Sequence, residues 1–181
     1  ALKHGAVANR AQVHIKWVDS ETVTSENVDE KLGDVSGILV PGGFGDRGID
    51  GMICAIRYAR EHQVPFLGLC LGMQLTIVEY ARNVLGYHDA HSVELDPATT
   101  HPVIHLMPDQ DGIEDIGGTL RLGSYPCVLD KNSKAYGLYG EETIHERHRH
   151  RYEVNNDYRT FLTEHGMMLS GMSPDNRIVE M

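Results

Sequence analysis

The chain has 181 residues, of which 41% are hydrophobic and 23% charged, the composition of one folded domain of ordinary size. Its net charge of −10 disfavours a nucleic-acid partner, because an acidic surface repels phosphate backbones. Lys, Arg, Asp, Glu or His interrupts every apolar run well short of the roughly 20 residues of a membrane helix, and no signal peptide is evident. We therefore expect a cytoplasmic domain with no membrane partner.

The N-terminal part of the chain predicts short elements. Residues 1–10 resemble the last turns of a helix, residues 13–18 alternate as a half-buried strand does, and a short helix is expected after Ser25. The chain opens without Met, and residues 177–181 resemble an interrupted strand. We expect residues 1–181 to be a domain truncated at both ends.

Two strand–loop–helix units follow. The apolar run 35–40, the glycine-rich break 41–45 and the helical spacing from Ile49 to Ile56 form the first unit. The run 64–69 and the helical stripe of 71–85 form the second. The pattern predicts an α/β fold whose mostly parallel central sheet is flanked by helices, with functional sites at the carboxyl ends of the strands.

The remainder of the chain is less regular. Residues 87–123 carry several proline and glycine turns, and 120–129 is expected to return as a strand. A polar helix is expected from about 155 to 165, and a hairpin around 173–176.

The string Gly68-Leu-Cys-Leu-Gly-Met-Gln74 places Cys70 between a strand and a helix, with glycines two residues to either side. This is a nucleophile-elbow pattern, in which a Cβ at Gly68 or Gly72 would clash. The helix N-terminus would lower the pKa of the thiol, and the N–H of Leu71 would face an oxyanion. Cys54 and Cys127 fall within a helix and a strand, where ordinary packing explains them.

A second oxyanion donor is expected from the loop Pro41-Gly-Gly-Phe-Gly-Asp-Arg-Gly48, most reasonably the N–H of Gly43. The same loop is also compatible with a simple tight turn or a phosphate cradle. A Walker-type loop would end in Gly-Lys-Ser/Thr, whereas this one ends in Asp-Arg-Gly.

Charged residues crowd the string Glu146-Arg-His-Arg-His-Arg-Tyr-Glu153. A metal site is disfavoured, because the arginines beside His148 and His150 oppose a cation and no cysteine is near. The string either presents Arg151 to an anionic or zwitterionic small ligand or is a solvated polar strand, and its spacing does not choose between these.

Together these strings carry a resemblance. The sequence around Cys70 resembles the nucleophile motif of class I, triad-type glutamine amidotransferases. The strings 41–48, 117–123 and 146–156 are similar to those of the CTP synthase family within that class. The likeness covers nearly the whole chain.

The resemblance implies a glutaminase domain in which Cys70 attacks the side-chain amide of L-glutamine and releases ammonia, with Leu71 and Gly43 as oxyanion donors. The residues that it places around glutamine are Gly43, Leu71, Gly72, Met73, Gln74, Glu94 for the amino group, and Arg151 and Tyr152 for the carboxylate. Phe44 and Arg47 are the implied contacts of GTP, the allosteric activator. No cofactor or metal is implied in this domain.

The resemblance also implies a separate synthase domain, absent from these residues, which uses ATP and Mg²⁺ to convert UTP to CTP in a homo-oligomer, a tetramer when complete. The family takes its base and third triad member from a Phe-His-Pro-Glu string, and no His-Pro-Glu occurs here. We therefore expect little glutamine turnover from these residues alone. The alternatives are a catalytically silent glutamine-binding regulatory module, another amidotransferase or hydrolase of this fold, and a redox-sensing thiol protein.

Overall fold

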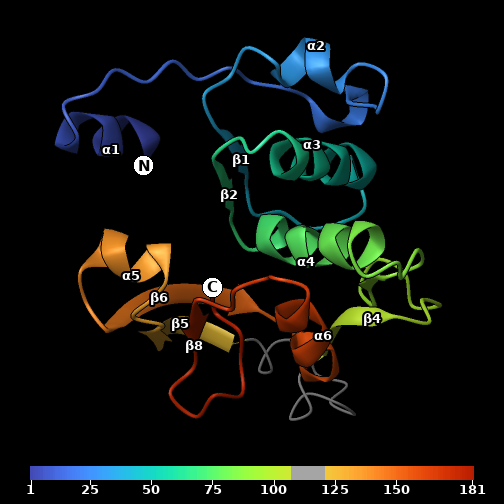
Figure 1. The fold of residues 1–181 in the computed structure, drawn as a ribbon, viewed down its shortest axis with the longest axis vertical. Coiled ribbons are helices and arrows are strands. Elements are labelled where there is room, and N and C mark those ends of the chain that lie inside the picture. The colour runs from blue at the N-terminus through green and yellow to red at the C-terminus, as the bar shows by residue number, and fades with distance from the viewer. Residues whose placement is uncertain (107–120) are drawn as a thin grey trace.

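The computed structural model describes residues 1–106 and 121–181 (Figure 1). The chain begins with α1 (Leu2–Ala8), as expected, and continues through a 3-10 turn (Ser20–Thr22) and α2 (Val28–Leu32). The expected strand at 13–18 is wrong: residues 11–19 form no strand. Val13 and Ile15 are 36% and 38% exposed and Trp17 is 89% exposed, so of the apolar side chains in 13–18 only Val18 packs against a core cluster.

The two predicted strand–loop–helix units are confirmed. They comprise β1 (Ile38–Val40), α3 (Ile49–Glu61), β2 (Phe66–Gly68) and α4 (Leu71–Asn83). β1 and β2 pair in parallel with Ile38 opposite Phe66, so both strands end at the same edge. α3 and α4 lie side by side (Figure 1) and pack against each other. The loop at 41–48 and Cys70 therefore meet at one place, as the parallel arrangement predicted.

The remaining strands form two further small sheets. One has the order β3 (His91–Ser92), β4 (Pro102–Leu106), β7 (Tyr152–Val154), and the other has the order β6 (Thr143–His150), β5 (Arg121–Leu129), β8 (Gly171–Met172). Only the β3–β4 pair among these is parallel. The expected single, mostly parallel central sheet is thus not what the described residues form. The strands that pair in parallel, β1 with β2 and β3 with β4, have only two to five residues each. The longest ladder, between β5 and β6, is antiparallel.

Three short helical segments and a turn complete the chain. α5 (Lys134–Tyr139) follows β5, and the expected polar helix is present as a 3-10 turn (Asn156–Tyr158) and α6 (Arg159–Glu164). The expected hairpin is confirmed by an antiparallel bridge between Met172 and Val179. Of the string 117–123, residues 117–120 lie outside the described residues, and the others begin β5.

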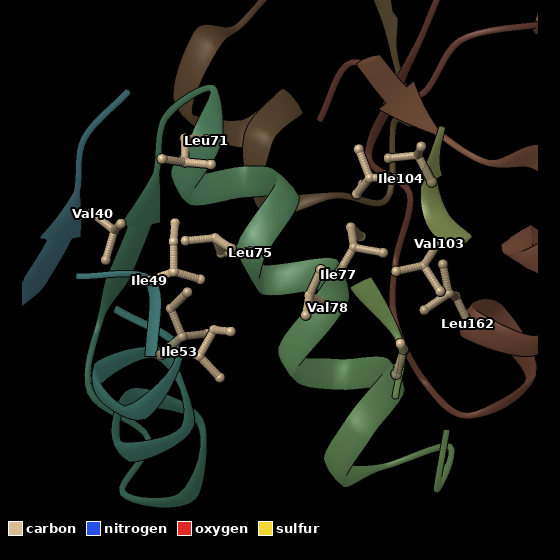
Figure 2. Packing of buried hydrophobic residues seen from close by; sticks show 14 of the residues in the cluster. Val40, Ile49, Ile53, Leu71, Leu75, Ile77, Val78, Val103, Ile104 and Leu162 are labelled. Atoms are coloured by element: carbon tan, nitrogen blue, oxygen red, sulfur yellow. The ribbon is translucent and has the colours of Figure 1, made fainter. Parts of the chain in front are cut away.

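The main core is centred on α4 (Figure 2). Leu75, Ile77 and Val78 of α4 are at most 4% exposed. They lie between the apolar residues of β1 and α3 on one side and those of β4 and α6 on the other (Figure 2). α4 is anchored along its length, so its first turn, which carries the functional string, has a fixed position.

Among the described residues, no helix has both the length and the apolar character needed to cross a membrane.

Candidate active site

Cys70 occupies a strained turn between β2 and α4. Its backbone has φ 54° and ψ −107°, a conformation that L residues rarely adopt. A Cβ on Gly68 would lie 2.7 Å from the backbone of Gly72, and a Cβ on Gly72 would lie 2.2 Å from the carbonyl oxygen of Val40. Both glycines are therefore required by close backbone approach, as the elbow pattern predicted.

The thiol of Cys70 is half-buried, and its pKa lies below the usual value for a cysteine. A hydrogen bond with the side chain of His150 is the main reason that its pKa is lowered, and the N–H of Leu71 acts in the same direction. Burial and the charge of Glu153 oppose the shift. The effect expected from the helix N-terminus is present, but the larger contribution comes from a histidine that the sequence analysis assigned to no role.

The other two cysteines differ from Cys70. Burial raises the pKa of Cys54, on α3, and raises the pKa of Cys127, on β5, to about 11. Cys127 is fully buried and packs in the small core formed by Leu129 and Ile144. Their surroundings fit the expected packing roles, so Cys70 is the activated thiol of the three.

The glycine-rich loop 41–48 lies against the elbow. A Cβ on Gly42 would be 3.2 Å from the Cβ of Cys70, and a Cβ on Gly43 would be 3.4 Å from the Cδ2 of Leu71. Gly43 is thus next to the proposed oxyanion donor. The two GTP candidates project outward: Phe44 is 72% exposed and lies under the guanidinium of Arg149, while Arg47 pairs with Glu21 at 2.5 Å.

Arg151 and Glu94 belong to one electrostatic environment. Burial raises the pKa of Glu94, and the charge of Arg151 acts on that pKa in the opposite direction. The Nε of Arg151 is buried and has no hydrogen-bond partner within the part of the chain that the structure describes. An unpaired buried guanidinium N–H favours binding of an anionic group.

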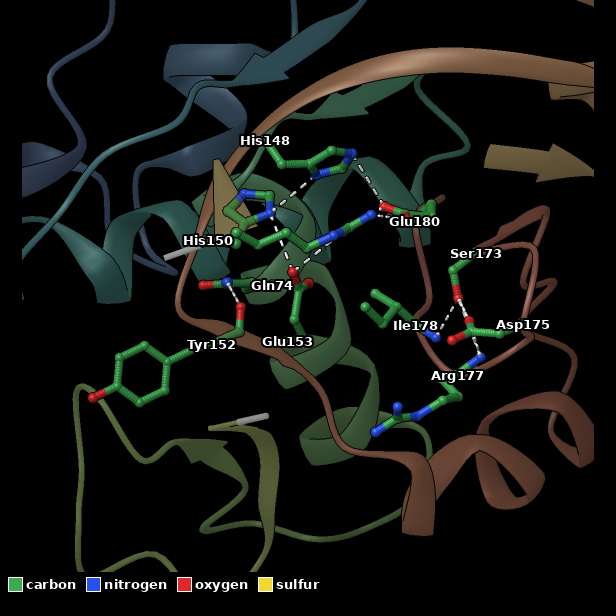
Figure 3. Close-up of polar contacts among 11 residues, drawn as sticks. Gln74, His148, His150, Tyr152, Glu153, Ser173, Asp175, Arg177, Ile178 and Glu180 are labelled. Carbon is green, nitrogen blue, oxygen red and sulfur yellow. Dashed lines mark hydrogen bonds and ion pairs between the residues drawn. The ribbon is translucent and has the colours of Figure 1, made fainter. Parts of the chain in front are cut away.

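Gln74 connects α4 to the strand that carries the ligand-binding candidates. Its buried side chain donates from Nε2 to the carbonyl oxygen of Tyr152 at 2.9 Å (Figure 3). The Tyr152 ring lies 5.9 Å from the guanidinium carbon of Arg151. The Gln74 side chain therefore positions β7 relative to the elbow, and Met73 packs against the main core.

No group of three or more His, Cys, Asp and Glu residues in ranges 1–106 and 121–181 is arranged to hold a metal ion. Within these ranges, His148 and His150 likewise belong to no such group. Both rings contact carboxylates of a buried ionic network instead.

The comparisons with known proteins agree with this geometry. The profile of the family "Glutamine amidotransferase class-I" matches residues 1–181. The chain belongs to this family. Curated relatives of this amidotransferase chain include the CTP synthases of Clostridium acetobutylicum, 62% identical, and Halalkalibacterium halodurans, 61% identical, each over 99% of the chain. The chain spans 34% of the length of each of these relatives.

A solved structure gives the same assignment for the fold. It is the glutaminase domain of Trypanosoma brucei CTPS with bound acivicin, at 35% identity and a TM-score of 0.91. The match covers 98% of this amidotransferase chain and 70% of that one. The α/β class and the class I amidotransferase fold are thereby confirmed.

Sequence reasoning missed two residues that act on the pKa of Cys70, the candidate nucleophile: His150 and Glu153. They lie in the charged string that was analysed for Arg151, and their spacing resembles that of any polar strand. Only the return of β6 and β7 to the N-terminus of α4 brings them near Cys70. Glu153 carried a weak signal, because this carboxylate directly precedes the apolar Val154. The structure shows Glu153 to be 4% exposed.

Proposed function

We propose that this chain is a glutaminase domain in which Cys70 hydrolyses L-glutamine to glutamate and ammonia. The observation that supports this most directly is the elbow itself: an activated thiol at a strained strand-to-helix turn, with the Leu71 N–H directed at it. The match of the chain to the glutaminase domain of a CTPS supports the same substrate class.

In the proposed reaction, the Cys70 thiolate attacks the carboxamide carbon of glutamine and a C–S bond forms. The N–H groups of Leu71 and Gly43 stabilise the negative charge on the amide oxygen. The C–N bond then breaks and the nitrogen takes up a proton from solvent to leave as ammonia. Water cleaves the thioester, releasing glutamate and restoring the thiol.

Arg151 and Glu94 would orient the two charged ends of the substrate. Arg151 binds the α-carboxylate, for which its buried Nε, without a hydrogen-bond partner among the described residues, is suited, with Tyr152 beside it. Glu94 binds the α-ammonium group. Gly72, Met73 and Gln74, in the first turn of α4, complete the glutamine site at the base of the elbow.

The whole protein would then resemble its relatives. Ammonia would pass to a synthase domain that uses ATP and Mg²⁺ to aminate UTP to CTP, in a homo-oligomer that is a tetramer when complete. GTP would activate the glutaminase through Phe44 and Arg47. Because no His-Pro-Glu string occurs in these 181 residues, we further propose that they turn over little glutamine in isolation.

The test uses the protein that carries this chain together with its synthase domain. Glutamate release is expected to fall about 10³-fold or more in Cys70→Ala, because the nucleophile is lost. Saturating glutamine is expected to protect Cys70 from iodoacetamide. Protection without any glutamate release would instead identify a silent glutamine-binding module. The absence of both protection and glutamate release would contradict the proposal.

A further inference from the structure

Arg151 lies where the chain passes from one small sheet to another. β6 ends at His150 and is paired with β5, whereas β7 begins at Tyr152 and is paired with β4. Arg151 forms the bend between them. Within ranges 1–106 and 121–181 it has no partner in either ladder, so the direction of its side chain depends on what holds the residues beside it.

The two sides of this bend are held differently. On the preceding side, the long β5–β6 ladder continues to the last residue of β6. On the following side, β7 has only three residues. Its far end is tied to β4 by Asn155, which donates from its backbone to the carbonyl oxygen of Val103 and from its side chain to that of Pro102, both at 2.9 Å. Tyr152, at the near end, is paired with Leu106, the last residue of β4, and has a further contact with α4.

Gln74 supplies that contact from the first turn of α4. This residue is 6% exposed, and its side chain donates from Nε2 to the carbonyl oxygen of Tyr152 at 2.9 Å (Figure 3). α4 is a fixed reference for β7, because its apolar residues fill the centre of the main core. The hydrogen bond therefore sets the position of the backbone beside Arg151 relative to the helix that begins at Cys70.

Few contacts among the described residues direct the guanidinium of Arg151 itself. Its Nε is buried and has no hydrogen-bond partner there, and its guanidinium carbon lies 5.9 Å from the ring of Tyr152. The charge of Arg151 acts on the carboxyl of Glu94, so the two groups proposed for the ends of glutamine share one site. A shift of the bend would change the distance between these groups, and with it the fit of the substrate.

We propose that Gln74 is a positioning residue of the glutamine site: by holding the carbonyl group of Tyr152, it keeps the Arg151 guanidinium at the distance from Cys70 that the substrate carboxylate requires. This inference rests on the proposed function, in which Arg151 binds the α-carboxylate of glutamine. Loss of the Gln74 amide then weakens the binding of glutamine and leaves the reactivity of the thiol unchanged.

The experiment measures alkylation of Cys70 by iodoacetamide at rising glutamine concentrations, in the protein that carries this chain with its synthase domain. The rate without glutamine reports on the thiol, and the glutamine concentration that halves this rate reports on binding. Gln74→Met keeps a side chain of similar length that cannot donate the hydrogen bond. We expect its half-protecting concentration to rise about tenfold, while its rate without glutamine stays within about twofold of the wild-type rate.

The double variant with Arg151→Met identifies the route of this effect. Adding Gln74→Met to Arg151→Met should change the half-protecting concentration less than about twofold, because the group through which Gln74 acts is gone. Thr76→Val is the matched control, since its hydroxyl donates within α4 itself, to the carbonyl oxygen of Gly72 at 2.8 Å, and it should match the wild type in both readouts. Gln74→Asn keeps the amide but is one methylene shorter, and is expected to act as Gln74→Met does if that variant does not fold.

The proposal would be overturned by an unchanged half-protecting concentration in a folded Gln74 variant. It would also be overturned if the effects of Gln74→Met and Arg151→Met multiplied, because Gln74 would then contact glutamine directly, or if the rate without glutamine changed as much as the half-protecting concentration, because the effect would then lie at the elbow. Failure of glutamine to protect even the wild type would contradict the glutamine site and this role together. Protection without glutamate release would contradict only the proposed hydrolysis, since the measurement requires binding and no turnover.

Discussion

Gly72 and Val40 approach so closely that the first turn of α4 is seated directly on the end of β1. A Cβ added to Gly72 would lie 2.2 Å from the carbonyl oxygen of Val40 and 3.0 Å from its carbonyl carbon. The obstacle is backbone, which cannot rotate away as a side chain can. Any residue larger than glycine must therefore displace α4, and with it Cys70 and the N–H of Leu71.

Gly72→Ala is accordingly expected to lower the free energy of unfolding by about 2 kcal/mol and to reduce the alkylation rate of Cys70 at pH 7. Gly137→Ala is the matched control, because a Cβ there meets nothing within 4 Å and alanine favours a helix. Urea unfolding and Cys70 alkylation, measured on both variants, check the prediction. Equal stability of the two variants would show that the elbow does not need its glycine.

The elbow could be predicted from sequence because its determinants are local. Gly68, Cys70 and Gly72 lie within five residues, and the apolar patterns on either side define the strand and the helix. The same holds for β1 and α3. Local pattern failed at 13–18, where alternation predicts a strand but Trp17 is exposed and no strand among residues 1–106 and 121–181 pairs with the segment.

The surroundings of the thiol could not be predicted in the same way. His150 is 80 positions from Cys70, and no sequence period connects them. Its contact depends on the antiparallel ladder of β5 and β6 and on the hydrogen bond from Gln74 to Tyr152, which bring the charged string to α4. Nothing in the string itself distinguishes His148 from His150, whereas burial and partners do.

Arg151→Met is expected to raise the KM for glutamine about 10-fold to 100-fold, because the charged hydrogen bonds proposed between Arg151 and the substrate carboxylate would be lost. The thermal transition should change little, since the Nε of Arg151 has no partner to lose within the described residues. Steady-state glutamate release measures the effect in the protein with its synthase domain. Arg147→Met, at an exposed position of β6, is the control and should keep the wild-type KM. An unchanged KM in Arg151→Met would remove this residue from the glutamine site.

The ion pair between Arg47 and Glu21 bears on the proposed GTP contact. The two side chains are 79% and 43% exposed, so the pair is a surface contact that a nucleotide phosphate can replace. Arg47→Ala should raise the GTP concentration for half-maximal activation about tenfold, and Glu21→Gln, which releases Arg47, should lower it about twofold. Arg57→Ala, another exposed arginine that pairs with a glutamate, serves as the control. Identical GTP curves for Arg47→Ala and wild type would exclude this contact.

A large stability effect of a single charge is expected at Arg60, which pairs with the buried Glu79. The Nε of Arg60 lies 3.1 and 3.0 Å from the two carboxylate oxygens, and its Nη2 lies 2.8 Å from Oε1. The Glu79 side chain is 1% exposed, so removal of the arginine leaves a buried carboxylate without its cation. Arg60→Met should therefore lower the free energy of unfolding by about 3 kcal/mol, measured by urea denaturation at pH 7.

The double variant Arg60→Met with Glu79→Met distinguishes a lost charge partner from lost packing. Because it removes the stranded carboxylate as well, the double variant should be more stable than Arg60→Met alone. Arg57→Met provides the surface comparison, since Arg57 pairs with Glu61 where both side chains are more than 40% exposed, and should cost about 0.5 kcal/mol or less. If the double variant were less stable than Arg60→Met, the contribution of Arg60 would be its packing between α3 and α4 and not the compensation of a buried charge.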